Sequence, residues 1–136
     1  MDLYSKKFEI RWADLDPNYH VLHSKYYDYG AYCRMSFFVE NGLTPQLMTH
    51  YQIGPILFRE ECNFKREIHF GDDMLINMKI VKHSDNFSRI TITHEIWKGD
   101  IICANIVAEI ALIDTLKRKL AIPPQEIIDI FRRINS

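Results

Sequence analysis

Cysteine is scarce in this sequence, and its spacing excludes the common cysteine chemistries. The three cysteines, Cys33, Cys62 and Cys103, lie far apart and form no C-x-x-C pair of the kind found in zinc sites and redox motifs. We therefore expect three free thiols in a reducing compartment, which predicts a cytoplasmic protein.

A long hydrophobic run and an excess of charge of one sign are also missing. The longest apolar stretch, residues 101–113, is interrupted by Asn105 and Glu109, whereas a membrane-spanning helix needs about 20 apolar residues. The first seven residues lack the apolar core of a signal peptide, so we expect a soluble protein without a membrane partner. Lys and Arg number 17 against 18 Asp and Glu, and this balance argues against nucleic acid as a partner.

Internal repeats, low-complexity tracts and linkers are absent as well. The 136 residues are 47% hydrophobic and 26% charged, a composition typical of chains that bury a core. Because a chain of this size fits one core, the sequence predicts a single domain over residues 1–136.

The first half of the chain predicts a strand, a loop and one long helix. Phe8, Ile10 and Trp12 alternate with polar or small residues, which is the period of a strand with one buried face. Residues 15–23 have no regular period and predict a loop, after which Ser24 is placed to cap a helix.

The predicted helix covers residues 25–40, which contain no proline, and Asn41-Gly42 is a natural end. One stripe of residues at helical spacing is expected to be buried. Its members are Tyr26, Tyr29, Gly30, Cys33, Phe37 and Asn41. Because large apolar residues also occur on the other sides, we expect the helix to be covered over much of its circumference, with Gly30 allowing a close approach of the backbone.

The second half predicts an antiparallel sheet and a short terminal helix. After a connecting stretch over 44–54, four strand-like runs follow, over residues 56–70, 74–83, 87–97 and 101–113. The short turns between them can join only antiparallel neighbours, which predicts a meander. Apolar residues at helical spacing predict a final helix over 125–133. Together these elements predict an α+β fold in which the sheet wraps around the long helix.

The densest group of chemically active residues lies in the loop before the long helix. It contains two carboxylates, a tyrosine and two imidazoles: Asp14, Asp16, Tyr19, His20 and His23. An aspartate at the start of a helix is suited to acyl transfer, because it attacks an acyl carbon or activates water while free helix amides stabilise the oxyanion. Residue spacing alone leaves two alternatives to this catalytic interpretation. The group is a metal site, or the aspartates form turn and cap hydrogen bonds.

The segment from Asp16 to Tyr26, DPNYHVLHSKY, resembles the D-x-x-G-H-V-x-[NH]-x-x-Y signature of the 4-hydroxybenzoyl-CoA thioesterase family and its Tol-Pal-associated acyl-CoA thioesterase branch. The catalytic aspartate of that family falls on Asp16, and the histidine seven positions later falls on His23. The resemblance continues through Arg34 and Gly42-Leu43, along residues 64–72, and to Ile122-Pro123. Tyr19 stands where glycine is usual and Glu67 where many members have proline, which bears on the shape of the substrate.

The resemblance implies a hot-dog fold, in which a five-stranded antiparallel sheet wraps around a long central helix and subunits pair edge to edge. A homodimer or homotetramer is therefore expected. It further implies hydrolysis of an acyl-CoA thioester, with Asp16 as nucleophile or general base and backbone amides near His23 as the oxyanion hole. That mechanism requires no cofactor or metal. As an alternative to the oxyanion hole near His23, the side chain of His23 orients the thioester or the water.

Further site residues are expected around this centre. His20 and Tyr26 support the loop, Tyr19 and Phe64 contact the substrate, and CoA phosphates meet cations at strand ends. The cations are Lys65, Arg66, Lys82 and Arg89. The tyrosines of the long helix either line an acyl tunnel or pack in the core. Glu60 or Glu61 either supplies a second carboxylate across a subunit boundary or lies on an exposed strand face.

Other functions remain open on the sequence. The nearest enzymatic alternative is a thioesterase acting on acyl-acyl carrier protein. A different class is a noncatalytic acyl-CoA-binding protein that keeps the fold, against which the intact Asp16 argues. A dehydratase would need a differently placed histidine and acid.

Overall fold

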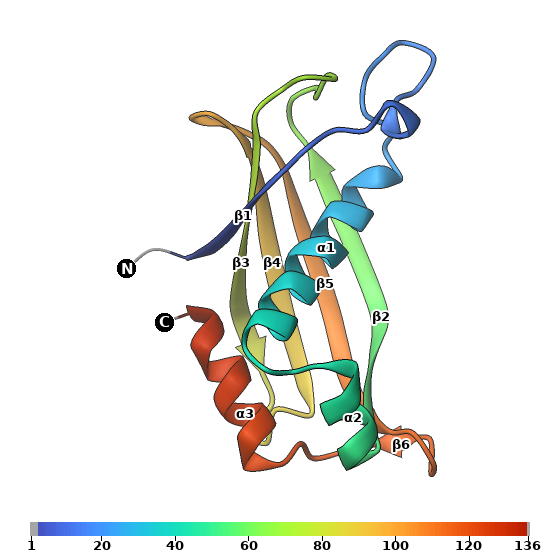
Figure 1. Ribbon diagram of the computed structural model, residues 1–136, viewed down its shortest axis with the longest axis vertical. Helices are drawn as coiled ribbons and strands as arrows, with labels where there is room; N and C mark the ends of the chain where they lie inside the picture. Colours follow the sequence, from blue (N-terminus) through green and yellow to red (C-terminus); the bar gives the residue numbers. More distant parts are fainter. Residues whose placement is uncertain (1–2, 136) are drawn as a thin grey trace.

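The computed structural model describes residues 3–135, which form one antiparallel sheet with three α-helices (Figure 1). Its strands are β1 (Tyr4–Phe8), β2 (Ile53–Phe64), β3 (Met74–His83), β4 (Arg89–Lys98), β5 (Ile101–Asp114) and β6 (Lys119–Leu120). The strand order is β1-β3-β4-β5-β2, with the two-residue β6 paired to β5. Five main strands behind one long helix confirm the predicted α+β hot-dog architecture.

The long helix α1 (Lys25–Glu40) lies across one face of the curled sheet, as Figure 1 shows. Its bounds are those predicted, and it ends where Gly42 adopts a φ of 91°, a conformation that glycine reaches without strain. α2 (Pro45–Tyr51) and α3 (Gln125–Arg132) lie near the opposite end of the sheet from the start of α1. Within residues 3–135, no helix combines the length and apolar character needed to span a bilayer.

The core lies between α1 and the central strands. Alternate residues of β3, β4 and β5 turn toward the helix, as the period of two requires. The fully buried ones include Ile76, Met78, Ile92, Ile96, Ala104, Ile106 and Ala108. A β-carbon on Gly30 would lie 3.3 Å from His94 Cδ2 and 3.4 Å from Ile106 Cδ1. Gly30 therefore does allow the helix to approach the sheet closely, as predicted.

The predicted first strand is wrong in position. β1 ends at Phe8, Ile10 is buried outside the sheet, and Trp12 is 73% exposed within a 3-10 turn (Trp12–Asp14). The chain turns at Arg11 because its backbone N–H donates to the Asp14 carboxylate at 3.1 Å. The alternation of residue types continues past Phe8, but β3 begins at Met74, the partner of Phe8, so residues 9–12 have no strand to pair with.

The predicted meander is correct for β3, β4 and β5 but wrong for the run over 56–70. β2 ends at Phe64, since the amides of Lys65 and Arg66 both donate to Cys103 O and leave the regular ladder. Residues 65–73 then carry the chain from one edge of the sheet to β3, which does not neighbour β2. The connection is thus longer than the two-residue turn on which the prediction rested.

Two further features differ from expectation. The stretch over 44–54 contains α2, whose Thr44 cap and Pro45 at the first turn are ordinary helix-start signals. α1 is also less covered than predicted, because one side of it, containing Tyr32, Met35 and Val39, is exposed.

The terminal helix is confirmed, and its packing yields a stability prediction. Ile127 of α3 is 1% exposed, whereas Ile122 just before the helix is 68% exposed. We expect Ile127→Ala to lower the free energy of unfolding by about 2–5 kcal/mol, because it leaves a cavity, and Ile122→Ala by less than about 1 kcal/mol. Urea denaturation followed by circular dichroism measures both. Equal losses would contradict the packing of α3 in the core.

Candidate active site

The loop that carries Asp16 is a tight hydrogen-bonded structure before α1. Asp16 N–H donates to His20 O at 2.7 Å, and Tyr19 N–H donates to Asp16 O at 2.9 Å. Tyr19 closes the turn with a φ of 64°, which is a left-handed conformation that costs a non-glycine residue roughly 1–2 kcal/mol. This geometry accounts for the glycine usual at that position in the family pattern.

The carboxylate of Asp16 is half-buried at the edge of a cleft. Its Oδ1 accepts hydrogen bonds from the amides of Asn18 at 2.8 Å and His20 at 3.1 Å. Its Oδ2 makes no hydrogen bond with another residue in the range 3–135. One carboxylate oxygen is thus anchored while the other is available for chemistry.

We call the space beside this carboxylate the Asp16 cleft. Its volume is about 350 Å³, and it opens between the loop, the start of α1 and the end of β2. The lining residues are Asp16, His20, Val21, His23, Tyr26, Phe64, Lys65, Arg66 and Glu67. Tyr26 packs edge-to-face against Phe64, with ring centroids 4.8 Å apart, so two aromatic rings form part of its wall.

The start of α1 borders this cleft. Lys25 N–H donates to Leu22 O at 2.9 Å, but Ser24, at the cap position as predicted, makes no side-chain cap bond. The amides of His23 and Ser24 have no acceptor among the described residues 3–135, and the exposed His23 side chain also lines the cleft. Free amides at a helix N-terminus carry partial positive charge, so this edge is suited to an oxyanion.

The second aspartate of the loop has a structural position. The Asp14 side chain is fully buried, and its carboxylate accepts bonds from Arg11 Nη2 at 2.9 Å and Tyr29 OH at 3.0 Å. Burial alone would raise the pKa of Asp14, but the hydrogen bonds from Arg11 and Tyr29 outweigh it and lower the pKa below its usual value. Asp14 therefore joins the loop to α1 and does not line the Asp16 cleft.

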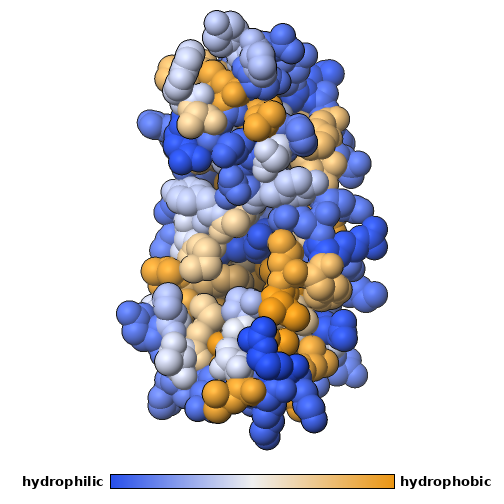
Figure 2. All heavy atoms as spheres, turned by 90° about the vertical axis from the view of Figure 1, so that its right-hand side faces the viewer, coloured by the Kyte–Doolittle hydropathy of each residue, from blue (hydrophilic) through white to orange (hydrophobic). Residues whose placement is uncertain are grey.

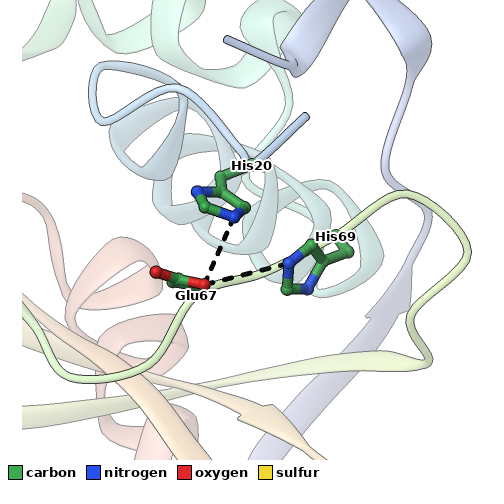
Figure 3. A group of neighbouring side chains, drawn as sticks. All are labelled: His20, Glu67 and His69. Carbon is green, nitrogen blue, oxygen red and sulfur yellow. Dashed lines mark ion pairs between the residues drawn. The ribbon is translucent and has the colours of Figure 1, made fainter. Parts of the chain in front are cut away.

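A cluster of two histidines and a glutamate borders the cleft (Figure 3). His20 Nε2 lies 3.2 Å from Glu67 Oε2, and His69 Nε2 lies 3.9 Å from the same oxygen. These three side chains have ligand atoms within 4.8 Å of one another and could hold a metal ion. The spacing of residues in the sequence did not predict this cluster, because His20 is far along the chain from Glu67 and His69.

A second polar group lies inside the fold. Buried Arg34 of α1 contacts His94 Nε2 of β4 at 3.0 Å and the Glu60 carboxylate of β2 at 3.6 Å. Because His94 Nδ1 lies 2.8 Å from Asn77 O, Nδ1 carries the proton and Nε2 accepts from Arg34. Burial and the nearby Arg34 charge lower the pKa of His94 to about 3, so the imidazole is neutral.

An apolar cavity of about 190 Å³ lies beside Arg34, between α1 and β2. Apart from Arg34, its lining is almost entirely aliphatic or aromatic, with Ala31, Met35 and Phe38 from α1 and Pro55 and Leu57 from β2. Figure 2 shows hydrophobic atoms around a hollow on this side of the molecule. The position of Arg34 in the wall of a cavity was not predicted from the sequence.

The structure brings together most of the predicted site residues but separates three, Tyr19, Arg89 and Lys82, the last of which pairs with Thr91 at the far end of β3. Asp16, His20, His23, Tyr26, Phe64, Lys65 and Arg66 share the Asp16 cleft. Tyr19 lies instead in a second hollow of about 400 Å³, beside Trp12, that Asp16 also borders. Arg89 lies near the opposite end of the sheet, since it pairs with Ala111 whereas Phe64 pairs with Ala104. Its guanidinium lies over the Phe58 ring.

The antiparallel sheet around α1, with a carboxylate cleft at the helix start, defines a hot-dog-fold protein of the thioesterase type. A family model described as the thioesterase-like superfamily matches residues 10–131, and the chain belongs to this superfamily. It is accordingly a thioester hydrolase.

Solved structures of the same fold are similar over nearly the whole chain. A 1,4-dihydroxy-2-naphthoyl-CoA thioesterase from Synechocystis has a TM-score of 0.86 at 19% identity, covering 96% of each chain. A Staphylococcus aureus protein in complex with CoA has a TM-score of 0.90 at 14% identity, covering 99% of this chain and 87% of its own. A probable thioesterase from Bartonella henselae has a TM-score of 0.81 at 20% identity, covering 90% of this chain and 100% of its own. No curated protein matches the sequence.

The buried position of Asp14 predicts a pH-dependent stability effect. The folded pKa of Asp14 is below its unfolded value, so its charge stabilises the fold above the unfolded pKa, and this contribution is lost as the pH falls through the folded pKa. We expect Asp14→Asn to lower the free energy of unfolding at pH 7 by about 1–3 kcal/mol, with a smaller difference at pH 3. Urea denaturation at both pH values measures this, and a loss that grows at pH 3 would contradict it.

Proposed function

We propose that this protein hydrolyses an acyl-CoA thioester to free CoA and a carboxylic acid, with Asp16 as the catalytic carboxylate. The observation that supports the proposal is the hydrogen bonding of the Asp16 carboxylate. One oxygen is held by two backbone amides, and the other has no partner at the edge of a cleft beside a helix N-terminus. A fixed carboxylate beside free amides is the arrangement that acyl transfer requires.

Two chemical routes use the same carboxylate. As nucleophile, Asp16 attacks the acyl carbon, CoA leaves as a thiolate that takes a proton from water, and water hydrolyses the resulting anhydride. As general base, Asp16 takes a proton from water while that water attacks the acyl carbon, and the leaving thiolate then takes the proton from Asp16. In both routes the amides near His23 stabilise the negative charge on the acyl oxygen.

The rim of the cleft supports binding of a CoA group. Lys65 and Arg66 are exposed beside Asp16 and supply positive charge for phosphates. The Staphylococcus aureus protein of similar fold was solved in complex with CoA, which fits this assignment. An acyl group carried on acyl carrier protein presents the same thioester and is the alternative substrate class.

The apolar cavity is our candidate for the acyl end. It lies along the same α1–β2 seam as the Asp16 cleft, since Tyr26 borders the cleft and Arg34 borders the cavity. Eight residues of helix separate these positions, which is roughly 12 Å at 1.5 Å per residue. An acyl chain lying along this seam would have its thioester at Asp16.

We also propose that the active form is a homodimer or homotetramer. β2 is an edge strand of the sheet, and its exposed side chains include Ile56, Leu57, Phe58 and Phe64. α1 also exposes apolar residues, and Figure 2 shows patches of hydrophobic atoms among polar ones on this side of the molecule. Pairing of two β2 edges would cover this surface and satisfy free backbone groups.

Substitution of Asp16 tests the catalytic assignment. We expect Asp16→Asn and Asp16→Ala to lower kcat at least about a hundredfold, because no nucleophile or base remains. A panel of aromatic, short and long acyl-CoA esters with a thiol-detecting reagent measures turnover, with circular dichroism to establish folding. Undiminished turnover would remove Asp16 from the mechanism, and binding without turnover in the parent protein would favour the noncatalytic acyl-CoA-binding alternative.

Filling the cavity tests its role in acyl binding. Ala31 is partly exposed and lines the cavity from α1, so a phenyl ring at this position would occupy space without replacing a buried side chain. We expect Ala31→Phe to lower kcat/KM for long-chain acyl-CoA by about tenfold or more while acetyl-CoA hydrolysis changes little. An equal effect on all chain lengths would place the acyl group elsewhere.

A further inference from the structure

The cluster of His20, Glu67 and His69 has no role in the proposed hydrolysis. His20 comes from the loop before α1, whereas Glu67 and His69 come from the connection after β2 (Figure 3). The His20 and Glu67 side chains point toward one another, and His69 approaches the same oxygen of the Glu67 carboxylate. All three are accessible, with side-chain exposures of 33%, 66% and 47%.

We propose that His20, Glu67 and His69 bind a divalent transition-metal ion such as Zn²⁺. Two imidazoles and one carboxylate form a donor set suited to zinc, which prefers four ligands in a tetrahedron. Bonds of about 2.0–2.1 Å place tetrahedral ligand atoms roughly 3.4 Å apart. The separations of 3.2 and 3.9 Å from Glu67 Oε2 bracket that value.

The backbone fixes the spacing of the two histidines. His20 and His69 face each other in an isolated antiparallel bridge, and the adjacent Val21 N–H donates to Ile68 O at 2.9 Å. Their rings lie edge to face, with centroids 4.8 Å apart. Because the ligand atoms already lie within 4.8 Å of one another, small side-chain rotations complete the site.

A neighbouring carboxylate supports His69 as a ligand. Asp72 Oδ2 accepts the backbone N–H of His69 at 2.8 Å and lies 3.8 Å from His69 Nδ1. A metal-binding histidine commonly has a carboxylate near its second ring nitrogen, which orients the ring and raises its basicity. Lys98, the nearest cation to Asp72, is paired with it at 3.3 Å.

An ion at this site would stiffen the catalytic loop. His20 N–H holds Asp16 Oδ1, so a bond from the His20 ring to the ion would join the Asp16 loop to the connection after β2. Three protein ligands leave one tetrahedral position for water. The metal site itself does not depend on hydrolysis by Asp16, and its test uses binding alone.

The experiment is a titration of tag-free, chelator-treated protein with Zn²⁺ by calorimetry, with thermal melting alongside. We expect one ion per chain and a higher Tm with Zn²⁺. We expect His69→Ala and the equal-volume Glu67→Gln each to weaken affinity by at least about a hundredfold, because the first removes an imidazole ligand and the second replaces a charged carboxylate by a neutral amide. His50→Ala, which removes an exposed histidine of α2, should bind as the parent does.

Two further measurements separate this site from others. A Co²⁺ complex should lack the thiolate charge-transfer band that binding at Cys62 would give. His23→Ala should retain the ion. Circular dichroism of the metal-free variants establishes that they fold. Absence of Zn²⁺ binding by the folded parent, unchanged affinity in both His69→Ala and Glu67→Gln, a thiolate band, or loss of the ion with His23→Ala would each overturn the proposal.

Discussion

The buried carboxylate of Asp14 is the interaction on which the geometry of the site depends. It accepts bonds from Arg11 before the loop and from Tyr29 on α1, while its backbone carbonyl accepts the amide of Leu22 at the end of the loop. Three segments are thereby held at one point. A buried charge without such partners would be very costly, so the loop has little freedom to leave α1.

Two aspartates separated by one residue therefore have different environments. Asp14 is enclosed and accepts hydrogen bonds from the Arg11 and Tyr29 side chains and the Arg11 amide, whereas Asp16 lies at the surface of the loop with one oxygen held by backbone amides. The difference arises from the direction of the chain, since the 3-10 turn directs Asp14 inward and the following turn directs Asp16 to the cleft. The chemistry that we propose for Asp16 would leave undisturbed the interaction that holds the loop.

The seam between α1 and β2 connects the remaining functional features. The Asp16 cleft lies at one part of it and the apolar cavity at another, and β2 is also the exposed edge of the sheet. Arg34 is held in this apolar region by neutral His94 and the Glu60 carboxylate. This buried charge network keeps one wall of the cavity polar. The polar wall would affect which acyl groups bind, if the cavity holds the acyl end as we propose.

The sequence alone determined the elements with strong local signals. The bounds of α1 and β3 are those predicted, because helical periodicity, a cap position and turn residues are local properties. The D-x-x-Y-H loop likewise pointed to Asp16 and the thioesterase class. Its neighbours His20, His23 and Tyr26 are close in sequence and were expected beside it.

Only the tertiary structure decided what depends on distant segments. The extent of β1 along β3, the pairing of β2 with β5 and the approach of Glu67 and His69 to His20 arise from hydrogen bonds between residues far apart in the chain. The burial of Arg34 against His94 likewise requires the helix to be placed on the sheet. Residue spacing carries no information about such contacts, because the free energy that forms them comes from packing between elements and not from propensity within one.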